Sequence, residues 1–174
     1  MKQSVRARTN QKLYMARLNL DHWESLLATN ALPVEGEACR ESFLFHAVGG
    51  YRSLLAEMLE AADIDGSVET ADQAAVVAEK YGKTVAELSA LLQLEETQES
   101  WLSALLMKWG GCWSPSVTAV AETAPIECIP LKDISSHTVK FPDAPESYRT
   151  IYESLKLRTR LKIRHYCRYE TRSD

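Results

Sequence analysis

Apolar residues recur at helical spacing in two long stretches near the N-terminus. Steps of three and four residues connect the apolar positions over residues 13–27 and again over residues 41–62. Such steps place the residues on one face of an α-helix and on no single face of a strand. The segment 32–36 between them contains a proline and a glycine, which favour a turn. The pattern therefore predicts an antiparallel helical hairpin over residues 5–62.

Two adjacent glycines lie in the middle of the second predicted helix. If this helix begins near Glu37, an antiparallel hairpin sets Ala16 opposite Gly49 and Gly50. A glycine inside a helix costs about 1 kcal/mol relative to alanine. We therefore expect the pair to permit a close approach of the two helix backbones. A kink or a contact with a ligand is the alternative.

The rest of the chain continues the helical pattern, with one exception. Further helices are expected over 71–81, 84–94 and 101–109. Residues 112–145 hold five of the six prolines and predict a connection that is either mobile or contains a short strand around 126–131. Residues 146–168 predict a basic C-terminal helix, although apolar and basic residues alternate over 155–164 as in a strand. The fold class we expect is mostly α. Residues 1–174 form one irregular bundle of five to six helices built on the N-terminal hairpin.

Composition is that of an ordinary globular protein, with 45% hydrophobic and 25% charged residues. No apolar run approaches the roughly 20 residues needed to cross a bilayer, and the N-terminus lacks the apolar core of a secretory signal. The four cysteines lie far apart, which favours reduced thiols over disulfides or a zinc site. These features predict a cytoplasmic protein with no membrane contact, no metal and no cofactor.

Charge is strongly segregated along the chain. Residues 1–20 carry a net charge of +5, residues 21–144 carry −13, and residues 145–174 carry +4. In a bundle the last helix can lie against the first, which would merge the two basic ends into one patch. We expect this patch to contain Arg6, Arg8, Lys12, Arg158, Arg160, Lys162 and Arg164. It can hold nucleic-acid phosphates, or it can simply be a solvated face that offsets the acidic body.

A second candidate site is polar. Asn10 and Arg17 lie at the edge of the first stripe, and the expected register sets Asn10 opposite Glu57. Glu41 occupies the apolar stripe of the second helix, where a carboxylate must be paired or protonated. These four residues predict either a buried hydrogen-bond network that fixes the helix register, which we favour, or a polar pocket for a small ligand.

Three segments resemble a known family. They are residues 8–18, which begin Arg-Thr-Asn-Gln-Lys-Leu-Tyr, residues 41–46, which read Glu-Ser-Phe-Leu-Phe-His, and residues 100–106, which read Ser-Trp-Leu-Ser-Ala-Leu-Leu. Together they resemble an uncharacterised gammaproteobacterial family of helical proteins, a domain of unknown function. The resemblance implies a small cytoplasmic bacterial α-helical protein and brings no activity with it.

The sequence contains no recognisable catalytic constellation. His46 lacks the context of a phosphotransfer histidine, and Cys112 follows a helix C-terminus, which raises rather than lowers a thiol pKa. The leading hypothesis is therefore a non-enzymatic protein that binds another protein or a second copy of itself. The alternative is nucleic-acid binding through the basic patch.

Overall fold

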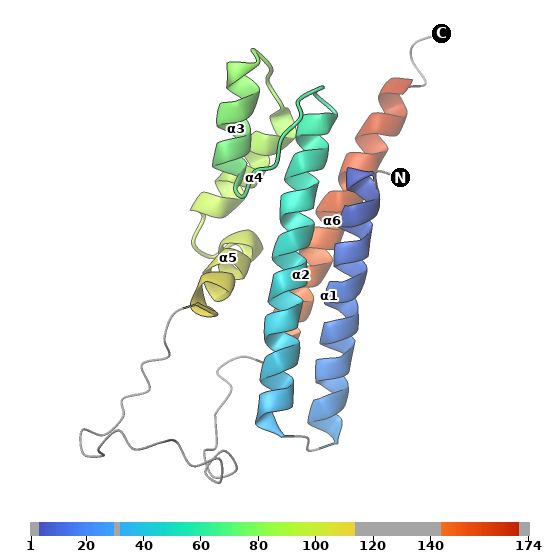
Figure 1. Cartoon of the computed structure of the whole chain (residues 1–174), viewed down its shortest axis with the longest axis vertical. Coiled ribbons are helices and arrows are strands. Elements are labelled where there is room, and N and C mark those ends of the chain that lie inside the picture. Colours follow the sequence, from blue (N-terminus) through green and yellow to red (C-terminus); the bar gives the residue numbers. More distant parts are fainter. Residues whose placement is uncertain (1–3, 30–31, 114–143, 171–174) are drawn as a thin grey trace, which may run out of the picture.

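The computed structural model describes residues 4–29, 32–113 and 144–170, and for Pro33 and residues 161–170 it describes only the helical backbone. These ranges contain six α-helices and no β-strand. In Figure 1, α3, α4 and α5 lie along the side of α2 that faces away from α1. The expected mostly-α bundle on an N-terminal hairpin is confirmed. The helices are α1 (Val5–Ala28), α2 (Pro33–Glu60), α3 (Ala71–Lys80), α4 (Ala86–Glu96), α5 (Trp101–Gly111) and α6 (Pro145–Glu170).

The first helix forms as its apolar pattern predicts. Ser4 is the N-cap, and its hydroxyl accepts a 3.2 Å hydrogen bond from the backbone N–H of Ala7. The residues of α1 that are buried are spaced by three or four, and Leu27 at the end of the stripe is exposed. Burial of this single face holds α1 against the bundle. Its members are Thr9, Leu13, Ala16, Leu20 and Trp23.

The register between α1 and α2 differs from the expected one by about one helical turn. A Cβ added to Gly49 would lie 3.2 Å from Cδ of Lys12, and one added to Gly50 would lie 3.5 Å from Leu13. The glycine pair therefore faces Lys12 and Leu13, and the expectation that it faces Ala16 is wrong. The reason is the turn, because α2 begins at Pro33 rather than near Glu37.

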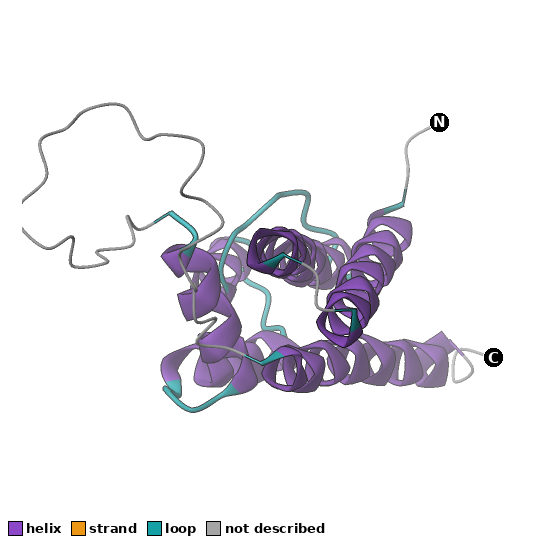
Figure 2. Ribbon diagram, turned by 90° about the horizontal axis from the view of Figure 1, so that it is seen from below, coloured by secondary structure: helices purple, strands orange, loops and turns teal. Residues whose placement is uncertain are grey.

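Aromatic rings join α6 to the hairpin. The ring of Tyr148 packs edge-on against Trp23 of α1 and Phe43 of α2, with centroids 5.1 and 5.6 Å away. All three side chains are fully buried. Arg149 adds a polar clamp, since its Nη2 lies 2.7 Å from carboxylate oxygens of both Asp21 and Glu24 on α1. These contacts fix the first half of α6 against the lower half of the hairpin (Figures 1 and 2).

A half-buried carboxylate connects α2, α3 and α4. Glu95 of α4 accepts a 2.5 Å hydrogen bond from the Tyr51 hydroxyl of α2. The same carboxylate accepts the backbone N–H of Ala71 at 3.0 Å, so it also caps the start of α3. Burial first, and then the neighbouring Glu95 carboxylate, raises the pKa of Tyr51. Tyr51 therefore stays protonated as the donor of this hydrogen bond.

The C-terminal helix is continuous over Pro145–Glu170, so residues 155–164 are helical and not a strand. The proline-rich connection predicted over 112–145 falls largely outside the described residues. None of the helices that the structure describes combines the length and the hydrophobicity needed to cross a bilayer.

The tight contact between α1 and α2 is testable at Ala16, which is fully buried. We expect Ala16→Leu to lower the free energy of unfolding by about 1–3 kcal/mol, the usual cost of forcing extra methyl groups into a packed core. The measurement is urea denaturation followed by circular dichroism. Ala7→Leu, at an exposed position of the same helix, is the control and should change little. An unchanged stability for Ala16→Leu would contradict the packing described.

Candidate functional site

The four residues of the predicted polar pocket do not come together. Asn10 is exposed, and Arg17 forms an exposed ion pair with Asp21 of its own helix at 3.3 Å. Glu57 is buried on α2. In the observed register Asn10 lies level with residues 51–53, about 6–9 Å along the axis from Glu57. The pocket prediction is therefore wrong as a single site, and the shifted register is the cause.

Glu41 agrees with its prediction only in part. Its side chain is 52% exposed and so is not buried, but it has a cationic partner, because it pairs with Nη2 of Arg40 at 3.9 Å and Arg40 also pairs with Glu37. Glu41 stands at the edge of the buried face of α2, beside the end of α5, where Cys112 and Trp113 leave an open hollow. The carboxylate is therefore available to solvent.

The predicted basic patch is divided between two surfaces. Arg8 and Lys12 of α1 face α2 and line a hollow there, whereas Arg6 is exposed on α1 and does not line it. On α6, Arg158 is half-buried and Arg160 is exposed, and both lie outside this hollow. Lys162 and Arg164 follow on the same helix, and their side chains are among those not described. Of the five predicted patch residues whose side chains are described, only Arg8 and Lys12 line this hollow.

The hollow that Arg8 and Lys12 line has a volume of about 600 Å³. We call it the basic hollow. Its floor and walls come from α1, α2, the segment that leads into α3, and Trp109 of α5. Arg52 of α2 also lines it and forms an ion pair with Glu69 at 3.1 Å. The lining residues are Val5, Arg8, Lys12, Phe45, Val48, Gly49, Arg52, Ser53, Ala56, Gly66, Ser67, Val68, Glu69 and Trp109.

Lys12 crosses from α1 to α2 at the edge of this hollow. Its aliphatic stem passes over Gly49, and its ammonium lies 4.5 Å from the centroid of the Phe45 ring and 3.4 Å from Nδ1 of His46. Burial, and then the nearby charge of Arg8, lowers the pKa of Lys12. Gly49 therefore leaves space for the aliphatic stem of Lys12. This role differs from the close backbone approach and from the kink considered for the glycine pair.

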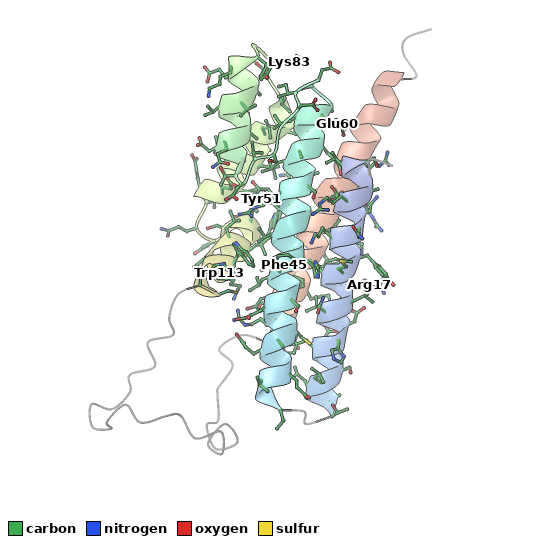
Figure 3. The ribbon with its side chains drawn as sticks, in the orientation of Figure 1. Arg17, Phe45, Tyr51, Glu60, Lys83 and Trp113 are labelled. Atoms are coloured by element: carbon green, nitrogen blue, oxygen red, sulfur yellow. The ribbon has the colours of Figure 1, made fainter. Side chains whose placement is uncertain are left out.

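Aromatic side chains continue from Lys12 across the face of α2 and α5. The ring centroid of Phe45 lies 5.2 Å from that of His46 and 6.2 Å from that of Trp109, and Trp109 lies 5.3 Å from Trp113. We call Phe45, His46, Trp109 and Trp113 the aromatic surface. Together with Glu41, Ser42 and Cys112 these residues line a second hollow of about 260 Å³. Figure 3 shows Phe45 and Trp113 on this face and Arg17 on the opposite side of the hairpin.

The two hollows present cationic side chains, exposed aromatic rings and one thiol, that of Cys112. Burial raises the pKa of the Cys112 thiol, which disfavours the nucleophilic thiolate. The described residues contain no group of three histidine, cysteine or acidic side chains placed to hold a metal ion. Cationic side chains such as those lining these hollows recognise anions. Exposed aromatic rings recognise apolar groups and cations.

The sequence pattern misses Arg52 and the aromatic surface. One signal was available, because Phe45 directly follows Leu44 and a single residue turns a helix by about 100°. Phe45 must therefore point away from the buried stripe of α2. The Lys12–His46 contact joins residues 34 positions apart on two helices, so no local pattern contains it.

Titration of His46 should make stability depend on pH. Burial first, and then the Lys12 ammonium, lowers the pKa of His46 below its ordinary value. The unfolded chain therefore takes up this proton at a higher pH, near 6.5, than the folded chain does. Folding stability should fall as pH drops from about 7.5 to 5.5, because the unfolded state binds more protons there.

The measurement is the free energy of unfolding in urea across this pH range for wild type and His46→Gln. We expect a shallower slope for His46→Gln. The same substitution at His22, exposed on α1, is the control. Identical slopes for wild type and His46→Gln would show that His46 does not carry this effect.

Comparison with known proteins gives a family but no function. No curated protein and no solved structure matches the chain. The model of a family of unknown function, DUF6586, matches residues 1–159. That span includes the three segments that carry the resemblance noted in the sequence and all of α1 to α5. The expected membership of an uncharacterised family is confirmed, and the chain belongs to the DUF6586 family of unknown function.

Proposed function

We propose that this chain is a non-enzymatic cytoplasmic protein that binds a partner protein through the aromatic surface. The observation that carries the proposal is the exposure of large rings that touch one another. Phe45 is 53% exposed and Trp113 is 73% exposed, with Trp109 between them. Neighbouring exposed rings on one face are typical of interfaces, where tryptophan is enriched among the residues that contribute most to binding.

Charge defines the partner that fits this surface. Glu41 is exposed in the same small hollow, and residues 21–144 carry a net charge of −13. The open face of Trp113 can accept a cation, and a carboxylate next to it can pair with the same group. We therefore assign to the partner a segment that presents an apolar side chain beside a lysine or arginine.

Capture from native cells with variants of the surface tests this proposal. We expect one protein to be retained by wild type and lost with Trp113→Ser, because tryptophan truncation at an interface centre costs about 2 kcal/mol or more, roughly thirtyfold in affinity. Leu27→Ser removes another exposed apolar side chain, at the far end of α1, and is the matched control. Retention of the same proteins by wild type and both variants would contradict the proposal.

The charge requirement has its own variant. Glu41→Gln should weaken binding of the captured protein and reduce its sensitivity to salt, whereas Glu99→Gln, at an exposed position before α5, should not. Sedimentation of the purified chain shows whether the chain binds a second copy of itself. A dimer that disappears in Trp113→Ser would assign the aromatic surface to a second copy and overturn the assignment to a different protein.

Nucleic-acid binding through the chain ends is the second candidate. It is favoured by the packing of α6 against α1, which run in opposite directions and so bring the basic N- and C-terminal segments towards the same end of the bundle (Figure 1). Arg6, Arg158 and Arg160 lie on these segments.

The test is fluorescence anisotropy with a generic labelled DNA and RNA at low salt. If the patch binds nucleic acid, the combined change of Arg158, Arg160 and Lys162 to Gln should flatten the salt dependence by about one unit per lost phosphate contact. We expect no measurable affinity in wild type, because Arg8 and Lys12 face α2 instead of α6. Saturable wild-type binding that the triple variant loses would overturn this expectation.

A further inference from the structure

We propose that the basic hollow is a binding site for a small phosphate ester, with the phosphate held by Arg8, Lys12 and Arg52. This inference does not rest on partner binding, although Phe45 and Trp109 of the aromatic surface also line the basic hollow. It assigns a separate ligand to the larger of the two hollows described above.

The charges of the hollow match a phosphate dianion. Three cations line it, and Glu69 is the single carboxylate among the lining residues, so their net charge is +2. A phosphate monoester carries a charge of about −1.5 to −2 at pH 7. A single carboxylate would leave about half of this positive charge without a counter-charge. Residues 21–144 carry a net charge of −13. The three basic side chains of the hollow therefore form a local positive region in a mostly acidic protein.

The three cations approach the hollow from two helices. Arg8 and Lys12 are one turn apart on α1, and Arg52 projects from α2, which runs alongside. Arg52 directs Nη2 to Glu69, while its Nε is buried and has no hydrogen-bond acceptor among the described residues. A buried donor without an acceptor is costly. A phosphate oxygen that draws the guanidinium into the hollow would supply one, in the paired geometry that arginine favours.

Lys12 is held in place before any ligand arrives. Gly49 beneath its stem and the ring of Phe45 beside its ammonium restrict the side chain. Less rotational freedom is then lost on binding, which favours affinity. The nearby positive charge of Arg8 and partial burial both disfavour the charged form of Lys12. A bound dianion would reverse this electrostatic cost.

The size of the hollow indicates an ester rather than free phosphate. A volume of about 600 Å³ is within the range of small-molecule sites, roughly 300–1,000 Å³, and far exceeds one phosphate group. Phe45 and Trp109 line the side of the hollow formed by α2 and α5. Their rings offer apolar contact and stacking. The ligand class we infer is a phosphate ester that carries a flat ring.

Isothermal titration calorimetry at low ionic strength tests the site with four probes. They are adenosine 5′-monophosphate, ribose 5-phosphate, inorganic phosphate and adenosine. We expect saturable binding of the first three, the tightest for the nucleotide, and none for adenosine. Absence of binding by all three phosphates would overturn the proposal. Equal affinities for the nucleotide and ribose 5-phosphate would overturn the ring assignment.

Substitutions then locate the site. Arg52→Gln and Arg8→Gln should each weaken nucleotide binding about tenfold or more, whereas Arg6→Gln on the same helix should not. Arg8 is exposed, so its variant remains informative if Arg52→Gln folds less stably. Trp113→Ser should retain nucleotide binding, because Trp113 lines only the smaller hollow. Equal losses in Arg6→Gln and Arg8→Gln would show non-specific attraction and contradict the site.

Discussion

The register between α1 and α2 is the constraint on which the rest of the structure depends. Small residues set it, because a Cβ on Gly36 would lie 3.2 Å from Nε1 of Trp23, and one on Gly49 would lie equally close to the Lys12 stem. A tryptophan and a lysine stem thus each pass over a glycine of the opposite helix. The ring of Trp23 also packs against Tyr148 of α6, so the position of α6 depends on the same tryptophan. Sliding α2 by one turn would break both glycine contacts together.

This register also creates the candidate site. It places Lys12 beside Phe45 and His46, and it opens the basic hollow between the start of α1 and the later half of α2. The same register keeps Asn10 away from Glu57 and leaves Glu41 at the open end of α5. Of the four positions of the predicted polar pocket, Asn10, Arg17 and Glu41 are therefore exposed and Glu57 is buried. The candidate surfaces lie instead where the Lys12 side chain crosses from α1 to α2.

Features set by local spacing could be predicted from the sequence, and features set by contacts between helices could not. The apolar steps over 13–27 correctly predicted α1, whereas over 155–164 apolar and basic residues alternate as in a strand although the segment is helical. The one-turn error arose at the turn, where Pro33 starts α2 directly; proline is common at the first helical position, so a signal existed. The Tyr51–Glu95 hydrogen bond spans 44 residues and leaves no trace in either helix's own pattern.

Charge segregation along a sequence does not by itself give charge segregation on a surface. A helix turns by about 100° per residue, so residues two apart point to nearly opposite sides while residues four apart share a side. Arg8 and Lys12 therefore face α2 together, and Arg6, two residues before Arg8, is directed away from them. The four basic residues of α1, Arg6, Arg8, Lys12 and Arg17, are divided between two faces of the helix. The exposed Arg8 and the half-buried Lys12 line the basic hollow with Arg52, where three cations lie on one surface, whereas Arg6 and Arg17 stay in solvent, where salt screens them. The three cations that line the hollow are consequently the ones from which selective recognition is expected.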